Sequence, residues 1–252
     1  MIFGVSTMIK QKLIQLLIIF MVIAIFIPGC KNSIQEPKIS MDSPYNWVGI
    51  EHNKCLSYVI GKVTNDSLKD WQDYDVEKLV IDYFNSTRNM NVQQNVKIVG
   101  SKTDLNKKYV DSYFQFVDSL VTIGSVSATF RNFDREIINA IGEYDFEESL
   151  EDIEAEVARS KINQYEKEIL FIEISVARHS SKFWSNETRI SKGKRPMLGL
   201  GPIAVLVGID VIGGGISAYF SWHSGHSGWD IAKDALVGAA GTSACAWLGA
   251  RL

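Results

Sequence analysis

Three of the four histidines are candidates for a metal site because of their spacing. His223 and His226 stand three residues apart in the segment WHSGHSGW, and His52 stands three residues before Cys55. Imidazole nitrogens and thiolates are common zinc ligands, so His52, His223 and His226 could together serve a metal-dependent enzyme. Neither pair is part of a CxxC or HExxH motif. The plainer prediction puts His52 half-buried on a helix and the other two histidines in a polar turn.

The same segment contains a serine among glycines. A nucleophile elbow has the pattern Gly-x-Ser-x-Gly between a strand and a helix. Here the segment reads GHSGW, so Trp229 replaces the second glycine after Ser227, and no strand pattern precedes it. We therefore predict no catalytic serine, and the sequence indicates no other catalytic residue and no cofactor.

Eight carboxylates and no basic residue lie between residues 143 and 156, in the segment EYDFEESLEDIEAE. A calcium loop would need the pattern Asp-x-Asp-x-Asp-Gly, which this segment lacks. Acidic side chains are favourable in the first turns of a helix because of its dipole. The segment therefore predicts a solvated helix rather than a metal site.

Cys30 is the residue with the most specific covalent chemistry. Lys10 and Lys12 form a short basic region, and residues 13–27 are apolar with one exception. This run of 15 residues is shorter than the ~20 that a helix needs to cross a bilayer. It ends in IPGC, which resembles the bacterial lipobox, where the peptide is cut before the cysteine and the cysteine is acylated. The alternative is an uncleaved signal anchor in which Cys30 has no role.

Acylation of Cys30 would fix both the organisation and the location of the chain. Residues 1–29 would be a lipoprotein signal peptide, and residues 30–44, which are polar and without periodicity, a tether between lipid and domain. The partner of the acylated Cys30 is then a lipid bilayer. We expect a lipoprotein of the bacterial cell envelope, in the outer membrane, with its periplasmic or surface side left open.

The charge of the chain argues against a nucleic-acid partner. The whole sequence carries 26 basic and 29 acidic residues. Without Lys10 and Lys12 of the signal, 24 basic and 29 acidic residues remain, a balance of −5. Nucleic-acid binding needs a basic surface, so we predict no such partner.

Two cysteines remain once Cys30 is acylated. An oxidising compartment and an even number of thiols would permit one disulfide between Cys55 and Cys245. The pairing needs the two Cα atoms within ~7 Å of each other. The alternative is that both cysteines pack as small apolar side chains.

The body of the chain, residues 45–188, has the apolar spacing of amphipathic helices throughout. Short helices are also indicated near 45–62 and 132–143. Glycines such as Gly61 and Gly124 lie between the apolar segments and are predicted to end helices. Only residues 95–99 are β-like. We predict an all-α fold with a bundle of five to six helices. The stripes are at residues 76–84, 109–121, 146–157 and 165–183.

The C-terminal part has a different composition. Residues 189–196 form a basic linker, and residues 197–252 are rich in glycine and alanine. Asp210 precedes a glycine by four residues, and Asp234 repeats this spacing. Small residues at such spacing let two helices approach backbone to backbone. We therefore predict a Gly/Ala-rich hydrophobic helical hairpin after the bundle, with SWHSGHSG as its turn.

This hairpin has two alternative environments. Insertion into a membrane is disfavoured by Asp210 in the middle of the first apolar run, at ~2.5–3.5 kcal/mol, and by Lys233 and Asp234 in the second. The basic linker beside the run is typical of a membrane-interface anchor. Packing onto the bundle or onto a protein partner is the alternative that we favour.

Short motifs resemble a known group of proteins. The segment VGIEHNKCLSYV with His52 and Asn53, the segment SSKFWSN with Phe183 and Trp184, and the glycine-rich tail are similar to parts of small uncharacterised helical lipoproteins of Bacteroidota. The resemblance implies a lipid-anchored helical protein and singles out these four residues. It implies no activity. Their structural roles would be a helix cap or core for His52 and Asn53, and core aromatics for Phe183 and Trp184.

Three functions are compatible with these patterns. The first is a lipid-anchored binding or interaction protein of the cell envelope, with no catalytic activity and with an envelope protein partner contacted through residues 197–252. The second is a membrane-active or toxin-like protein whose hairpin inserts into a bilayer. The third is the metal-dependent enzyme with His52, His223 and His226. The sequence favours the first.

Overall fold

The computed structural model describes residues 44–65, 76–88, 90, 107–190 and 200–250. These residues form eight α-helices and no strand, which confirms the prediction of an all-α bundle of five to six helices followed by a helical hairpin. Cys30 and the β-like segment 95–99 lie outside the described residues. The helices are α2 (Asn46–Asn65), α3 (Val76–Arg88), α4 (Lys107–Thr122), α5 (Ala128–Ala140), α6 (Phe146–Arg159), α7 (Gln164–Ile190), α8 (Leu200–His223) and α9 (Gly228–Ala250).

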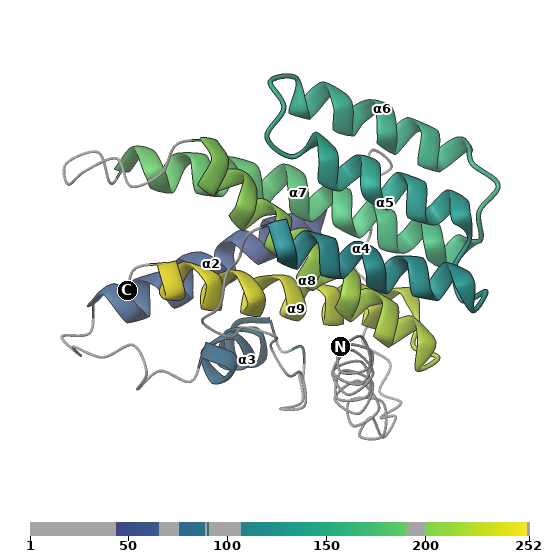
Figure 1. Ribbon diagram of the computed structural model, residues 1–252. Helices are drawn as coiled ribbons and strands as arrows, with labels where there is room; N and C mark the ends of the chain where they lie inside the picture. Colours follow the sequence, from purple (N-terminus) through teal and green to yellow (C-terminus); the bar gives the residue numbers. More distant parts are fainter. Residues whose placement is uncertain (1–43, 66–75, 89, 91–106, 191–199, 251–252) are drawn as a thin grey trace, which may run out of the picture.

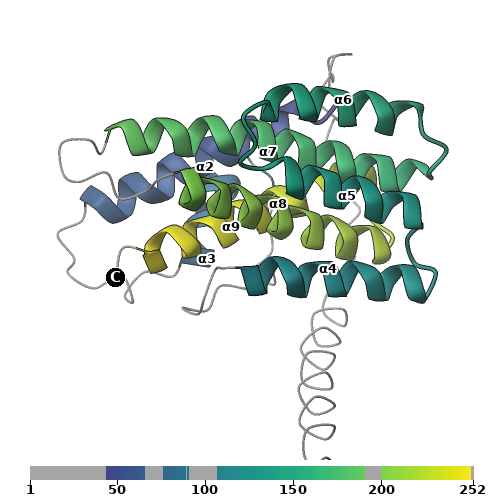
Figure 2. The ribbon, with the colours of Figure 1, turned by 45° about the horizontal axis from the view of Figure 1, so that its top comes forward.

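Four helices surround the centre of the molecule. α8 packs against α7 and α9, and α2 packs against the same two helices on the other side, so that α2, α7, α8 and α9 close into one bundle (Figures 1 and 2). α5 and α6 cover α7, α4 joins α5 to α8, and α3 lies on α2 and α9. The hairpin of α8 and α9 therefore supplies two of the four central helices, and its apolar residues share one core with the rest of the chain.

Helix α7 fixes the beginnings of two other helices. Ser127 caps α5 by accepting a hydrogen bond from the Phe130 amide, and the carboxylate of Glu166 on α7 accepts from the Ser127 amide at 2.5 Å. In α2, the Gly49 amide in the first turn donates to the Ser175 hydroxyl of α7 at 3.1 Å. The first amides of a helix have no partner inside it, so these side chains satisfy donors that would otherwise be buried without an acceptor.

Helices α8 and α9 meet at glycines. A Cβ added to Gly213 would lie 2.9 Å from the Gly238 carbonyl oxygen, and one added to Gly238 would lie 2.6 Å from the Gly213 carbonyl oxygen. No larger residue fits at either position without moving a backbone. The close approach predicted from the small residues is thus confirmed. The turn between the two helices is also where the sequence placed it, with Gly225 at a positive φ of 80°.

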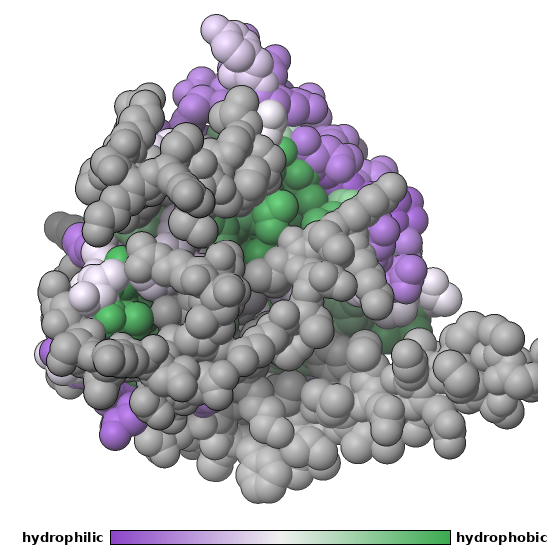
Figure 3. Space-filling view, turned by 60° about the vertical axis from the view of Figure 1, so that its left-hand side comes forward, coloured by the Kyte–Doolittle hydropathy of each residue, from purple (hydrophilic) through white to green (hydrophobic). Residues whose placement is uncertain are grey.

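The first helix of the hairpin is the one helix in the described part of the chain that is long and apolar enough to cross a membrane. Residues Ile203–His223 meet this test by length and composition, but 67% of their most apolar window is buried inside the protein. Its start is nearer to solvent, since Val205 is 39% exposed. Figure 3, which looks toward the left-hand side of Figure 1, shows apolar atoms flanked by hydrophilic ones on that face.

One predicted helix boundary is wrong. Gly61 does not break a helix but lies inside α2, which continues to Asn65. A Cβ at Gly61 would touch nothing within 4 Å, so this glycine faces open space. A single glycine costs a helix only ~1 kcal/mol, which the buried face of α2 outweighs. Gly124, in contrast, does end a helix, with a positive φ of 73° in the turn after α4.

Candidate functional site

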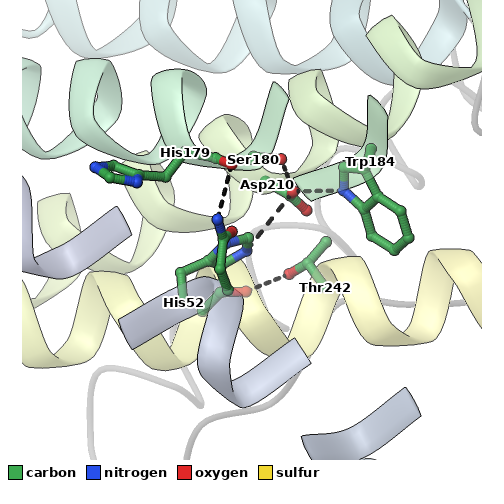
Figure 4. Close-up of polar contacts among 8 residues, drawn as sticks. His52, His179, Ser180, Trp184, Asp210 and Thr242 are labelled. Carbon is green, nitrogen blue, oxygen red and sulfur yellow. Dashed lines mark hydrogen bonds and ion pairs between the residues drawn. The ribbon is translucent and has the colours of Figure 1, made fainter. Parts of the chain in front are cut away.

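Each of the four central helices contributes a polar side chain to one buried cluster. His52 comes from α2, Ser180 and Trp184 from α7, Asp210 from α8 and Ser243 from α9. His52 and Asp210 are 0% exposed, and the other three are buried as well. Figure 4 shows the side chains of α2 and α7 converging on the Asp210 carboxyl group. We call these five residues the Asp210 cluster.

A single carboxyl oxygen organises the cluster. Asp210 Oδ2 accepts hydrogen bonds from the Ser180 hydroxyl and from Trp184 Nε1, the latter at 3.0 Å. His52 Nε2 lies 3.6 Å from the same oxygen, which is ion-pair distance when the ring is protonated. Burial raises the pKa of Asp210, while His52, Ser180, Ser243 and Trp184 oppose that rise. The surrounding donors therefore offset much of the cost of placing a carboxyl group in an apolar core.

The second ring nitrogen of His52 belongs to a further set of polar contacts along α2 and α7. His52 Nδ1 lies 3.1 Å from Asn53 Oδ1, and Asn53 Nδ2 donates to the His179 carbonyl oxygen at 2.8 Å. Because Asn53 uses its amide nitrogen on that carbonyl, its oxygen faces His52 and accepts from Nδ1. The Nε2 atom of His179 in turn lies 2.7 Å from Asn46 Oδ1. Polar contacts thus connect the two helices over two turns, next to the Asp210 cluster.

The connectivity of the cluster is not that of a catalytic triad. In a triad, the serine hydroxyl is bonded to one ring nitrogen of histidine and the carboxylate to the other. Here the Ser180 hydroxyl is bonded to Asp210 and not to His52, and His52 Nδ1 is already used by Asn53. A base cannot activate a hydroxyl that it does not contact. The arrangement can fix α2, α7 and α8 relative to one another, because side chains of α2 and α7 both contact the Asp210 carboxyl group of α8.

Three members of this cluster stood out in the sequence, but nothing in the sequence indicated that they meet. His52, Trp184 and Asp210 are brought together, and His52 is fully buried rather than half-buried as predicted, because its side of α2 faces α8. Phe183 packs against Trp184, with ring centroids 4.9 Å apart, so both are core aromatics as expected. Ser180 and Ser243 were not singled out. Ser180 could have been recognised from its position in the apolar stripe of α7, because a polar side chain there needs a buried hydrogen-bond partner.

The remaining histidines lie at the hairpin turn and have other partners. His223 is exposed and stacks on Tyr219, with ring centroids 5.9 Å apart. His226 Nδ1 lies 2.9 Å from the Ser221 hydroxyl and 3.2 Å from Asp234 Oδ2, so a hydroxyl and a carboxylate share one nitrogen. The hydrogen bond that His226 donates to the Asp234 carboxylate raises the pKa of His226. Asp234 therefore belongs to a contact at the turn, and it does not organise a buried cluster as Asp210 does.

The described residues give the metal hypothesis no ligand set. In this part of the chain, no group of three His, Cys, Asp or Glu side chains is placed to hold an ion. His52 faces Asp210 in the core, whereas His223 and His226 belong to the turn between α8 and α9. Ser227, the serine of the rejected elbow, donates to Asp230 at 3.0 Å and precedes the first residue of α9.

The two cysteines of the disulfide hypothesis are both thiols. No bond joins Cys55 to Cys245, which corrects the disulfide alternative and agrees with the apolar-packing one. Cys55 is buried in α2, and burial raises the pKa of its thiol well above the ordinary value. A thiol with a raised pKa forms little thiolate and is a poor nucleophile.

A second buried polar cluster was missed in the sequence. Tyr113 of α4 donates its hydroxyl hydrogen to Asp134 Oδ1 of α5 at 2.6 Å, and Glu173 Oε1 of α7 lies 3.4 Å from the same hydroxyl. Burial raises the pKa of Asp134 to about 7 and that of Glu173 well above its ordinary range. A side chain at Gly215 of α8 would collide with the Glu173 carboxyl group, so the glycine makes room for it.

Comparison with known proteins adds no relative to this description. No family model matches the chain, and no curated protein and no solved structure matches it either.

Proposed function

We propose that this chain is a lipid-anchored binding or interaction protein of a bacterial cell envelope, held at the outer membrane by an acylated Cys30. Its ligand or partner contacts the surface of the folded domain, and no catalytic step is part of the proposal. The anchor is supported by the basic start, the 15-residue apolar run and the terminal IPGC of residues 1–30. An envelope protein is the partner proposed for the accessible parts of residues 197–252.

One observation carries the proposal that the domain is a globular module. Asp210, in the middle of the most apolar helix, is 0% exposed and receives hydrogen bonds from two side chains of α7. Removing α8 from the bundle would leave this carboxyl group and its donors without partners, at a cost of ~3–5 kcal/mol for a broken buried pair. The hairpin therefore has its partners within the chain, which favours a closed domain on a lipid anchor.

The resemblance to small lipoproteins of Bacteroidota supports the same proposal. His52, Trp184 and Asp210 come from the three segments on which this resemblance is based, and they meet in one cluster. These residues therefore have a structural role in the core, which fits the helical protein that the resemblance implies.

Membrane fractionation with protease treatment tests the proposal. We expect the full chain in the outer-membrane fraction, and the Cys30→Ala variant to leave that fraction as a folded, protease-resistant protein. A second variant without residues 197–252 should be degraded, because two central helices are missing. Retention of Cys30→Ala in the outer-membrane fraction would refute the anchor, and mass spectrometry of the first peptide would show whether the sulfur of the wild-type chain is acylated.

A membrane-active protein is the second candidate, and the length and apolar character of Ile203–His223 favour it. It requires the hairpin to leave α2 and α7 before it enters a bilayer. Dye release from liposomes by the purified chain tests this, with the Asp210→Ala variant as a protein whose hairpin is more easily released. Leakage that increases in the variant supports insertion, and no leakage from either protein at any lipid composition excludes it.

A further inference from the structure

Aromatic rings gather at one end of the bundle, around the turn between α8 and α9. Tyr219 lies in ring contact with Phe116 of α4 and with Trp222, at 5.9 and 5.7 Å. Trp222 stacks on Tyr165 at the start of α7, with ring centroids 5.9 Å apart. On the other side of the turn, Trp229 stacks on Trp47 of α2 at 4.5 Å. Five helices, α2, α4, α7, α8 and α9, thus contribute rings to this end.

The same end holds two of the large apolar side chains that are most open to solvent. Ile123, in the turn after α4, is 71% exposed, and Tyr165 is 45% exposed. Trp47, Trp222 and Trp229 are partly exposed. The turns after α4, α6 and α8 all lie at the right-hand end of Figures 1 and 2. Exposed aromatic and aliphatic side chains from several turns form a contact surface that the described part of the chain does not cover.

The tether joins the domain close to this surface. Tyr45 is the second described residue, and its hydroxyl oxygen lies 3.4 Å from a Cβ placed on Gly228, at the beginning of α9. Trp47 follows and stacks on Trp229. Between Cys30 and Tyr45 lie only 14 residues. Even fully extended, a chain of that length spans no more than ~50 Å, so an anchor at Cys30 keeps this part of the domain near the bilayer surface.

We propose that this aromatic end of the bundle lies in the headgroup region of the bilayer that holds the acyl chains. The inference rests on the proposed lipid anchor. Tryptophan and tyrosine prefer the membrane–water interface, because a large apolar ring and a polar N–H or O–H both find partners there. Two acidic side chains near the turn have basic neighbours, Asp230 with Lys233 at 3.0 Å and Asp234 with His226 at 3.2 Å. Glu168, whose carboxylate lies beside Gly228, accepts a hydrogen bond from Gln164. These contacts reduce the electrostatic repulsion between this surface and anionic lipid headgroups.

Spin labels on the full chain in vesicles test this orientation. The chain is purified with its native lipid and reconstituted into phosphatidylcholine and phosphatidylglycerol vesicles, with Cys245→Ala to remove a half-buried thiol. One protein carries the label at His223→Cys, at the exposed tip of the turn. The matched control carries it at Tyr144→Cys, in the turn before α6, where Tyr144 is 107% exposed. That turn lies beside the start of α8, because a Cβ at Gly142 would lie 3.2 Å from Ala204 Cβ.

We expect the label at position 223 to lose its collisions with a water-soluble nickel chelate in vesicles and to gain collisions with lipid-dissolved oxygen. The label at position 144 should stay open to the chelate. Equal access at both positions, in a chain that sediments with the vesicles, would overturn the orientation while leaving the anchor in place. Dipolar broadening between labels at 223 would show a second copy on this surface and would also overturn it. A chain that does not sediment would refute the anchor, and this inference with it.

Discussion

Replacing Asp134 by asparagine should flatten the pH dependence of stability. The pKa of this buried carboxyl group is raised from 3.8 to about 7, so the folded protein binds a proton that the unfolded chain releases near pH 4. Stability is therefore greatest below the unfolded pKa and falls as the pH rises toward 7. Three pH units at about 1.4 kcal/mol each amount to on the order of 4 kcal/mol. Glu173, whose pKa is also raised, acts in the same direction.

Urea unfolding followed by circular dichroism between pH 4 and pH 8 measures this effect. The Asp134→Asn variant keeps an oxygen acceptor for the Tyr113 hydroxyl and cannot ionise, so its free energy of unfolding should fall less steeply with pH. Glu151→Gln, on the exposed face of α6, is the control and should retain the wild-type slope. Equal slopes in wild type and Asp134→Asn, or stability that rises with pH in this window, would refute the reasoning.

Three further substitutions have expected outcomes in thermal or urea unfolding. Asp210→Ala should lower stability by about 3 kcal/mol or more, since it leaves buried hydrogen-bond donors without an acceptor; a loss below about 1 kcal/mol would contradict the role given to the Asp210 cluster. Gly238→Val should cost about 3 kcal/mol or prevent folding, because its side chain collides with the Gly213 carbonyl oxygen. Gly61→Ala should raise stability by about 0.5–1 kcal/mol, since the new methyl group meets no neighbour and alanine favours the helix; destabilisation there would contradict the placement of Gly61 on an open helix face.

The helices could be predicted from the sequence because each has a stripe of apolar side chains at helical spacing. The two-residue spacing of a strand never extended far enough to compete with them. Gly61 was misplaced because a weak helix former was read as a boundary, whereas the buried face of α2 decides where that helix ends. Propensity is a small term beside tertiary packing.

The Asp210 cluster was only partly predictable. Asp210 stood out as a charge in an apolar run, and His52 and Trp184 stood out through short motifs. Their meeting depends on how α2, α7 and α8 pack, and helical periodicity within one segment contains no information about its neighbours. Glu173 of the second buried cluster could also have been recognised in the sequence. It lies between apolar residues in FIEIS, at a core position of α7, where a carboxyl group requires a buried partner.

The contribution of α8 and α9 to the central bundle constrains the order of folding. α2 and α7 are synthesised first, but the faces that they bury against α8 and α9 have no cover until residues 200–250 have been made. A product that stops before α8 exposes apolar helix faces that promote aggregation. The core between α2 and α7 therefore closes only after both helices of the hairpin are available.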